Sequence, residues 1–499
     1  MKAEDAGLKV SCRFPALAVE TGETMVSADQ LVQEAQKQNM ALETERRNVT
    51  WASREETRIL GVLTVLVLVA LSTASCQKQK VEPVTITFMD PEWSHDTSGR
   101  SIIAERNLQE FTKETGIRVE HVPAPETSLQ QLALSRELLH GGGSNPDVYG
   151  IDIVWAPLLD QDLLDLKPYF ANQLASMDSN LVAAYTVNGR VVAIPYHTNV
   201  GVLLYRRDLL EKYGYAIPPR NWSELEQMAL RIQTGERKAG VKDFWGFVWS
   251  GASGESLTCQ GLEWQLSDGG GQIIEPGGRI SVNNPNAIRA WQRAQRWIGW
   301  ISPPSVTSYE EWDAINNFEH YAKAAFRRSW TSDYFLSQPS QTPLAGKIGI
   351  TTLPTGTKGE VAVLGGFGLG VSRASAHQTE AAALIRFLLR KEEDLEVQRR
   401  QAGMPTYMKV YRLPAVLKAY ARPELGTLDK ESTVVSRPSS AIGTEYEKVS
   451  RAYAEALHSV LTGEVPAPKA AVRLDAQLLR IVGSQKNASS SQPAVSRIQ

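Results

Sequence analysis

Aromatic side chains with polar companions recur in this chain where strands are expected to end. They are Glu92 with Trp93, Asp152 with Trp155, His197 with Asn199, Trp330 with Tyr334, and Phe367 among glycines. A sugar presents apolar ring faces edged by hydroxyl groups, so flat aromatic rings with carboxylate and amide partners complement both of its surfaces. Each aromatic taken alone is more often part of a hydrophobic core. Their joint recurrence at loop tips predicts a carbohydrate site.

Other chemistries find little support. The seven histidines show no metal-ligand spacing, and no Walker loop occurs, so we expect no metal and no cofactor. His140 opens a His-Gly-Gly-Gly run that resembles an esterase oxyanion motif, but no G-x-S-x-G elbow accompanies it, and a helix C-cap explains it better. The glycines of 365–370 do not fit a dinucleotide fingerprint and instead let a flat ligand approach the backbone. Cys259 lacks basic neighbours and is expected to be a buried thiol.

Length and charge limit the classes of protein. A chain of 499 residues exceeds one hydrophobic core and should divide into two or three units. The formal net charge of -2 gives no basic surface for nucleic acid. Three cysteines cannot form a disulfide framework.

The N-terminal part indicates export. Residues 59–71 are apolar except for Gly61 and Thr64, and small residues then lead to Cys76. The run is short for a permanent span and fits a signal peptide, 59–76, ending in a bacterial lipobox whose Cys76 is lipidated. Thr73 stands where lipoboxes carry leucine, so a plain cleaved signal or an uncleaved anchor is the alternative. The preceding 1–58 is a polar leader, either untranslated or disordered, and 77–83 is a tether.

Strands and helices alternate after the tether, which favours a mainly parallel sheet with helices on both faces. The expected strands include 84–88, 117–122, 146–155, 244–248 and 348–353. The expected helices include 101–115, 128–139, 207–213, 222–232 capped by Asn221, 256–268, 285–298 capped by Asn284, 309–326, 379–390, 392–401, 414–421 and 446–462. Residues 158–166 are expected to form a further helix or a turn, ended by Pro168. Asp152 interrupts an apolar strand, so it should be paired, cap a neighbouring helix, or reach a strand end that faces solvent or ligand.

The stretch 188–232 contains the predicted hinge. Its apolar runs 191–195 and 200–205 are each about one strand long, and uncharged polar groups separate them. Pro195 cannot donate to a sheet, so pairing should weaken there. The chain is therefore expected to leave one sheet, expose His197 and Asn199 at a cleft, and enter a second sheet, a position that ligand sites prefer.

Several segments carry a family resemblance. They are PDVYGIDIVW (146–155), RVVAIPYHTNVGVLLYRRDLLEKYGY (190–215), FWGFVWSGASGESLTCQGLEW (244–264), AAFRRSW (324–330), GKIGITTLPTG (346–356) and LGGFGLGVS (364–372). Together they resemble extracellular solute-binding proteins of ABC sugar importers, most closely the trehalose/maltose-binding group. The resemblance implies a two-lobed α/β fold of periplasmic-binding-protein type II with crossing hinge segments. One lobe would comprise 84–198 and 348–390, the other 199–347 and 391–483, and 484–499 would be a disordered tail.

The resemblance also implies roles for residues. Asp152 resembles a ligand-contacting carboxylate, Trp330 a stacking aromatic, Gly366 with Phe367 a Gly-Trp pair, and Arg437 a sugar-contacting arginine. Three positions depart from the pattern: Asn199 replaces Asp, while His197 and Ser332 replace Tyr. Trehalose or maltose is therefore a first guess at the ligand.

The expected function is capture of a sugar by lobe closure, without bond chemistry, and delivery to ABC permease subunits. The protein would be a monomer outside the cytoplasm, anchored to the membrane by lipid. One alternative is a carbohydrate-active hydrolase using Glu92 and Asp152 as paired carboxylates. Another is a sensory or structural lipoprotein that has lost its ligand.

Overall fold

The computed structural model describes residues 83–89, 99–125, 127–141, 146–336, 344–392, 404–405 and 433–490. The chain divides into two units, Met1–Glu82 and Pro83–Gln499, and the described residues all belong to the second. The predicted signal peptide and Cys76 lie outside the described residues, as do the expected helices 392–401, in all but its first residue, and 414–421. Within the described ranges, no helix is long and apolar enough to span a bilayer.

A ten-stranded mixed sheet organises the second unit. Seven strands follow one another in space as β2 (Arg118–His121), β1 (Thr85–Met89), β3 (Val148–Asp152), β10 (Val361–Val371), β6 (Ile194–Arg206), β8 (Ala324–Trp330) and β7 (Trp245–Val248). Three short strands join this series: β9 (Ile348–Thr351) and β11 (Met404–Pro405) pair with β6, and β12 (Thr433–Val435) pairs with β10. A separate hairpin pairs β4 (Thr186–Val187) with β5 (Arg190–Val191).

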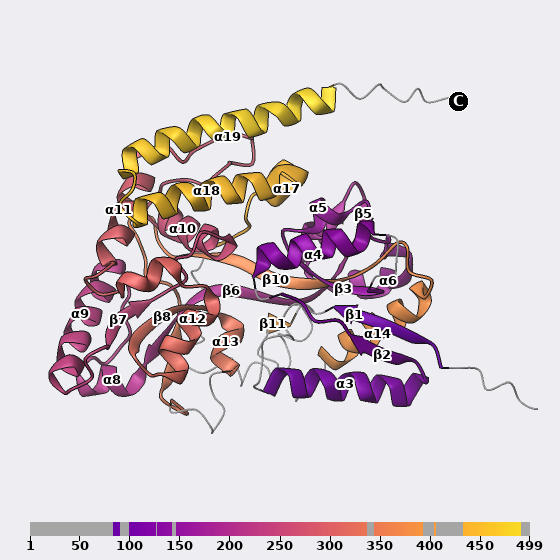
Figure 1. Cartoon of the computed structure of the whole chain (residues 1–499), viewed down its shortest axis with the longest axis horizontal. Helices are drawn as coiled ribbons and strands as arrows, with labels where there is room; N and C mark the ends of the chain where they lie inside the picture. The colour runs from indigo at the N-terminus through magenta and orange to yellow at the C-terminus, as the bar shows by residue number, and fades with distance from the viewer. Residues whose placement is uncertain are drawn as a thin grey trace, which may run out of the picture. The chain divides into compact units, whose positions relative to one another are not determined.

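Parallel pairing occurs at both ends of the strand series, between β1 and its neighbours and between β7 and β8. The middle is antiparallel, because β10 and β6 run against each other and against β3 and β8. The prediction of mainly parallel pairing therefore applies to the ends and to the short pair of β12 with β10. Figure 1 shows β6 and β10 as long ribbons passing side by side through the middle of the unit.

β6 is one continuous strand, so the prediction of two strands, 191–195 and 200–205, separated by polar residues is wrong. Its pairing partner changes along its length: Val200 pairs with Leu364 of β10, and Gly201 pairs with Trp330 of β8. Pro195 falls where the β6–β10 register shifts, and a bulge of this kind tolerates a residue without an N–H donor. The strand itself thus joins the two halves of the sheet, and β9 pairs with its second half.

Helices cover the sheet. Those before β6 are α3 (Gly99–Thr115), α4 (Ser128–His140), α5 (Ala156–Leu159), α6 (Lys167–Leu174) and α7 (Ser179–Ala184). After β6 come α8 (Arg207–Lys212), α9 (Trp222–Lys238), α10 (Glu255–Ser267), α11 (Pro285–Trp297), η3 (Pro304–Ser308), α12 (Glu311–Ile315), η4 (Asn316–His320), α13 (Thr331–Leu336), α14 (Gln378–Glu392), α17 (Ser439–Ile442), η6 (Gly443–Glu445), α18 (Tyr446–Leu461) and α19 (Ala467–Ser490). In Figure 1, α18 and α19 lie side by side above α10 and α11.

The predicted caps are confirmed. The side chain of Asn221 accepts a hydrogen bond from the backbone N–H of Glu224 at the start of α9. Asn284 likewise accepts from Asn286 and Ala287 at the start of α11. These bonds satisfy backbone donors that the first helical turn leaves without partners.

Three element predictions need correction. Pro168 lies in the first turn of α6 and begins that helix instead of ending one, because a first-turn residue needs no N–H donor. The predicted helix 309–326 covers α12 and η4, but its last residues enter β8, where pairing with β6 and β7 outweighs local helix propensity. Residues 484–490 of the predicted tail continue α19.

Candidate functional site

Four of the predicted ligand residues share one face of the sheet. Across three neighbouring strands, Asp152 of β3 pairs with Phe367 of β10, and Phe367 pairs with His197 of β6. Residues directly opposite one another in a sheet project to the same side, and so do alternate residues of a strand. Asn199, two residues after His197, therefore joins this set.

Trp330 extends the same face toward β8. It pairs with Gly201, which is two residues beyond Asn199 on β6. The Trp155 ring approaches that of Phe367 edge-on, with centroids 6.5 Å apart, and the His197 and Phe367 centroids are 5.8 Å apart. We call the set Asp152, His197, Asn199, Trp330 and Phe367 the crossing face.

Arg437 joins this face through Asp152. One Asp152 carboxylate oxygen accepts hydrogen bonds from Arg437 Nη2 at 3.1 Å and from the backbone N–H of Val154 at 3.0 Å. Arg437 Nη1 donates to Glu255 at 2.8 Å, so the guanidinium lies between two carboxylates. The Arg437 side chain is only 3% exposed, and a charge so deeply buried requires such partners. The hydrogen bond that Asp152 accepts from the Val154 backbone closes a local turn, so Asp152 does not cap a neighbouring helix.

The electrostatics of this cluster reflect burial. Burial raises the pKa of Asp152, and the Arg437 charge opposes that rise without cancelling it. Burial alone would lower the pKa of Arg437, but the surrounding acidic groups, Asp152 foremost and Glu255 among them, together outweigh burial and raise that pKa well above its usual value. The guanidinium is therefore charged at any physiological pH.

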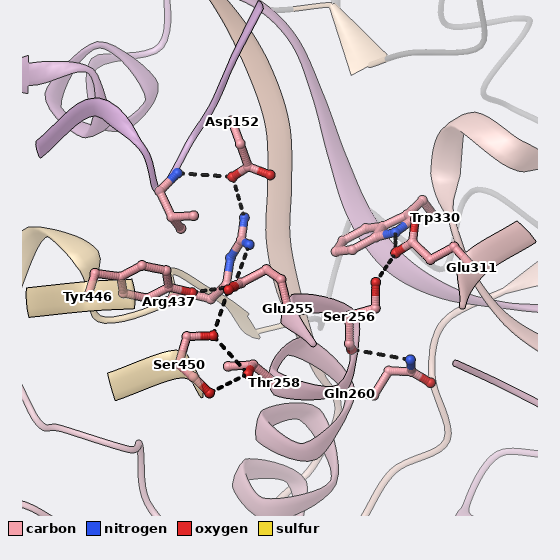
Figure 2. A network of polar contacts seen from close by, with 11 residues as sticks. Asp152, Glu255, Ser256, Thr258, Gln260, Glu311, Trp330, Arg437, Tyr446 and Ser450 are labelled. Atoms are coloured by element: carbon pink, nitrogen blue, oxygen red, sulfur yellow. Dashed lines mark hydrogen bonds and ion pairs between the residues drawn. The ribbon is translucent and has the colours of Figure 1, made fainter. Parts of the chain in front are cut away.

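Glu255 is a second centre of this network. Its carboxylate accepts hydrogen bonds from Arg437, from the Tyr446 hydroxyl, and from Ser450 Oγ at 2.6 Å. It is the first residue of α10, where a negative charge is favoured by the helix dipole. Ser450 also contacts Thr258 Oγ1 at 2.9 Å, which ties α18 to α10. Figure 2 shows Arg437 between the Asp152 and Glu255 carboxylates.

Trp330 is held by polar groups on two sides. Its indole N–H donates to Glu311 Oε1 at 2.9 Å, and Ser256 Oγ donates to the same oxygen at 2.7 Å. The Arg328 guanidinium carbon lies 4.0 Å from the ring centroid, close enough for a cation–π contact. Because Arg328 occupies one ring face, a stacked ligand would have to use the other. Glu255 and Ser256 are adjacent, so the first turn of α10 connects Trp330 to Arg437, as Figure 2 shows.

A buried ion pair holds the arginine that contacts the Trp330 ring. Arg328 donates two hydrogen bonds to Glu263, at 3.0 and 2.6 Å, and both side chains are at most 3% exposed. Glu263 also accepts from the backbone N–H of Val363 in β10. A Cβ on Gly201 would lie 2.0 Å from Glu263, so glycine is required where β6 passes the pair. The pair is therefore built into the sheet at the crossing of its strands.

Glycines of β10 permit the close packing of the crossing face. Gly366 has φ +133°, and a Cβ there would lie 2.4 Å from the carbonyl oxygen of His197. At Gly365 a Cβ would lie 3.0 Å from the Trp330 ring. The glycine-rich run thus lets β6 and the indole approach the backbone, whereas the predicted approach of a flat ligand stays a prediction.

The remaining predicted residues lie in different settings. Asn199 is buried, and its side-chain oxygen accepts a hydrogen bond from Thr331 Oγ1 at 3.4 Å. Tyr334 is 1% exposed within the core, where its hydroxyl accepts from Arg207, so the structure does not bring it to the crossing face. Glu92 and Trp93 lie outside the described residues.

Sequence reasoning missed Glu255, Glu311, Arg328 and Glu263. The first two stand at helix starts, where acidic residues are commonplace, so no local signal marks them. Arg328 and Glu263 each fell within segments of the family resemblance without being singled out. Cys259 is buried as predicted, and burial raises its pKa, but the expected lack of basic neighbours is wrong because the charges of Arg437 and Arg328 act on it. Among the described residues, no group of His, Cys, Asp and Glu is placed to hold a metal ion.

In this α/β fold two long strands, β6 and β10, connect the halves of one sheet, and a polar and aromatic face lies where they pair. This arrangement is that of the two-lobed class of binding proteins. The family model for bacterial extracellular solute-binding proteins matches residues 97–394. A probable ABC transporter-binding protein of Deinococcus radiodurans is 39% identical over 420 residues, covering 83% of this chain and 98% of the relative. The chain belongs to the bacterial extracellular solute-binding protein family.

Solved structures agree with this assignment. Maltose-bound MalE3 of T. maritima has a TM-score of 0.72 and 31% identity, and the match covers 80% of this chain and 100% of that one. The GacH receptor of Streptomyces glaucescens, solved unliganded and with acarbose, has a TM-score of 0.67 and 20% identity, covering 80% and 98%. At that identity the likeness shows the fold alone. The predicted two-lobed fold class is confirmed, and the family's description agrees with the predicted location outside the cytoplasm.

Proposed function

We propose that the crossing face, together with Gly366 and Arg437, binds a sugar as the substrate-binding component of an ABC importer. The observation that supports this most is the register of β3, β10, β6 and β8. It brings residues predicted separately from four parts of the chain onto one side of the sheet.

The chemistry of this face suits an uncharged, hydroxyl-rich ligand. Arg437 and Asp152 offer donors and acceptors for hydroxyl groups, and the single positive charge of Arg437 is already opposed by the carboxylates of Asp152 and Glu255. Trp330 and Phe367, both half-buried, provide flat apolar surfaces for a pyranose ring. Because Asn199 and His197 replace the carboxylate and the aromatic ring expected by resemblance, the ligand's hydrogen bonds at these positions should differ from those of the trehalose/maltose group.

Capture by closure follows from the placement of these groups on strands that join the two halves of the sheet. A sugar that contacts Asp152 from one half and Trp330 from the other favours the conformation in which both contacts form. No bond is made or broken. A di- or oligosaccharide such as maltose or trehalose is our first candidate, supported by the maltose bound to the 31%-identical MalE3. Delivery to permease subunits and a lipid anchor at Cys76 complete the proposal.

Titration calorimetry with the purified protein tests it. We expect saturable binding of at least one sugar from a panel of maltose, trehalose, tagatose, ribitol and mannitol, with the sugar recovered unchanged. Cleavage of a disaccharide would favour the hydrolase alternative. Absence of binding across the panel would favour a lipoprotein without a sugar ligand.

A further inference from the structure

The helix α19 has one side that packs against the unit and one side that faces solvent. Ala470, Leu474 and Leu478 are buried, and α19 packs on α18 and α11. In Figure 1, α19 lies along the upper edge of the unit with α18 beneath it. The opposite side carries exposed residues, which we call the α19 outer face: Lys469, Val472, Arg473, Ala476, Leu479 and Arg480.

An apolar stripe runs along the α19 outer face. Val472, Ala476 and Leu479 are spaced by four and three residues, which places them on one side of a helix. Val472 and Leu479 are 55% and 58% exposed, although each is large and apolar. Single exposed apolar side chains are ordinary, so this stripe alone does not indicate what binds it.

A basic stripe lies directly beside the apolar one. Lys469, Arg473 and Arg480 are spaced by four and seven residues, and the two arginines each follow an apolar member of the first stripe. All three are exposed, and none makes an ion pair with another described residue. Exposed cations beside an apolar stripe are typical of a helix that lies in the surface of a membrane.

The surroundings of α19 add to this positive charge. The neighbouring helix α11 carries the exposed Arg289 and Arg296 and has no acidic residue. Of the acidic groups nearby, Asp475 of α19 is partly buried, and Glu464 is exposed in the turn before the helix. The whole chain has a formal net charge of -2, so attraction to an anionic surface must come from this local excess of cations.

We propose that the α19 outer face binds the anionic phospholipid surface of a membrane. Val472 and Leu479 enter the boundary of the acyl chains, and the basic stripe contacts the lipid phosphates. A second copy of this chain fits the face less well, because a symmetric contact would bring the same cations against one another. The proposal goes beyond sugar capture and depends neither on the crossing face nor on a lipid at Cys76.

Vesicle sedimentation tests this proposal. The protein is residues 77–499, which contain the whole second unit and leave out the apolar run 59–71 that would itself enter a bilayer. The vesicles consist of phosphatidylcholine alone, or of phosphatidylcholine and phosphatidylglycerol in equal parts. We expect binding to the mixed vesicles to be at least about tenfold stronger than to the neutral ones. That binding should disappear at about 1 M salt, where charges are screened within about 3 Å.

Paired substitutions show whether the basic stripe makes the contact. Arg473→Gln with Arg480→Gln should weaken binding to the mixed vesicles about 25-fold, because each cation near an anionic surface contributes about fivefold. Arg220→Gln with Lys238→Gln is the matched control, since it removes the same charge from exposed positions at the two ends of α9. We expect the control to change binding by less than about twofold, because charges farther from the contact than the Debye length are screened. Arg473→Lys with Arg480→Lys keeps both charges and should bind like the wild type.

Val472→Ser with Leu479→Ser tests the apolar stripe and should weaken binding about tenfold. Absence of binding to the mixed vesicles, or equal binding to both kinds of vesicle, would overturn the proposal. The same holds if the folded glutamine pair binds like the wild type. A dimer seen by light scattering that the serine pair dissociates would assign the face to a second copy and also overturn it. Melting curves show whether each variant folds, and if the glutamine pair does not, the serine pair and the salt dependence decide. Sugar affinity should be the same in every variant, so this test and that of the proposed function fail separately.

Discussion

Replacing Arg437 with methionine tests how the buried charges of the site are balanced. Methionine keeps much of the apolar volume but removes the guanidinium, leaving the carboxylates of Asp152 and Glu255 without their shared partner. Both carboxylates are largely buried, at 14% and 13% exposure. Removing one member of a buried ion pair costs about 3–5 kcal/mol, because the remaining charge stays uncompensated.

The structure indicates the lower end of that range. Asp152 would keep the hydrogen bond from the Val154 backbone, and Glu255 would keep those from Tyr446 and Ser450. We therefore expect the free energy of unfolding to fall by about 3 kcal/mol at pH 8. Urea denaturation followed by tryptophan fluorescence measures this loss. The control is Arg220→Met, because Arg220 is 73% exposed and pairs with Glu224 of α9 at the protein surface, where ion pairs contribute little.

The loss should depend on pH. Burial raises the pKa of Asp152 in the folded protein, and Arg437 is the main opposing influence, so its removal raises that pKa further. A carboxyl group whose pKa is raised by folding contributes stability at low pH and loses it as pH rises through the folded pKa. The variant should therefore recover part of its stability as pH falls from 8 toward the unfolded value of about 3.9. A loss no larger than that of Arg220→Met, or one that is the same at pH 5 and pH 8, would refute the reasoning.

Three further predictions concern the site and the anchor. Trp330→Ala should weaken sugar binding about 10- to 100-fold, as measured by calorimetry. Trp330→Phe keeps a ring but cannot donate to Glu311, so it should lose less sugar affinity, and unchanged affinity in the alanine variant would show that this ring does not bind the sugar. Gly366→Ala should destabilise the protein by about 1–3 kcal/mol in chemical denaturation, because residue 366 has a positive φ and a Cβ there would meet the carbonyl oxygen of His197. An unaltered denaturation midpoint would contradict this expected strain. Cys76→Ala should move the protein from the membrane fraction to the soluble fraction if this thiol carries the lipid, and retention in the membrane fraction would favour an uncleaved anchor.

Local signals in the sequence were sufficient for most helix starts and for the α/β class. Asn221 and Asn284 cap helices as predicted, because an N-cap acts on backbone N–H groups two or three residues away. The family resemblance pointed to Asp152 and Arg437 as site residues, and the structure brings them together although they lie 285 positions apart in the chain. No local pattern could have shown that they bind each other.

Tertiary structure decided what depends on strand pairing. Only the register of β6 with β10 and β8 shows that Pro195 sits at a bulge inside a continuous strand, and that the crossing face exists. The same holds for Glu255, because an acidic residue at a helix start looks ordinary until Arg437 is placed against it. The sequence by itself determined which residues could serve a sugar site and where helices begin, since these depend on residue type and near neighbours. Which side chains meet depends on packing between distant segments of the chain. The energies of that packing cannot be read from any short stretch of sequence.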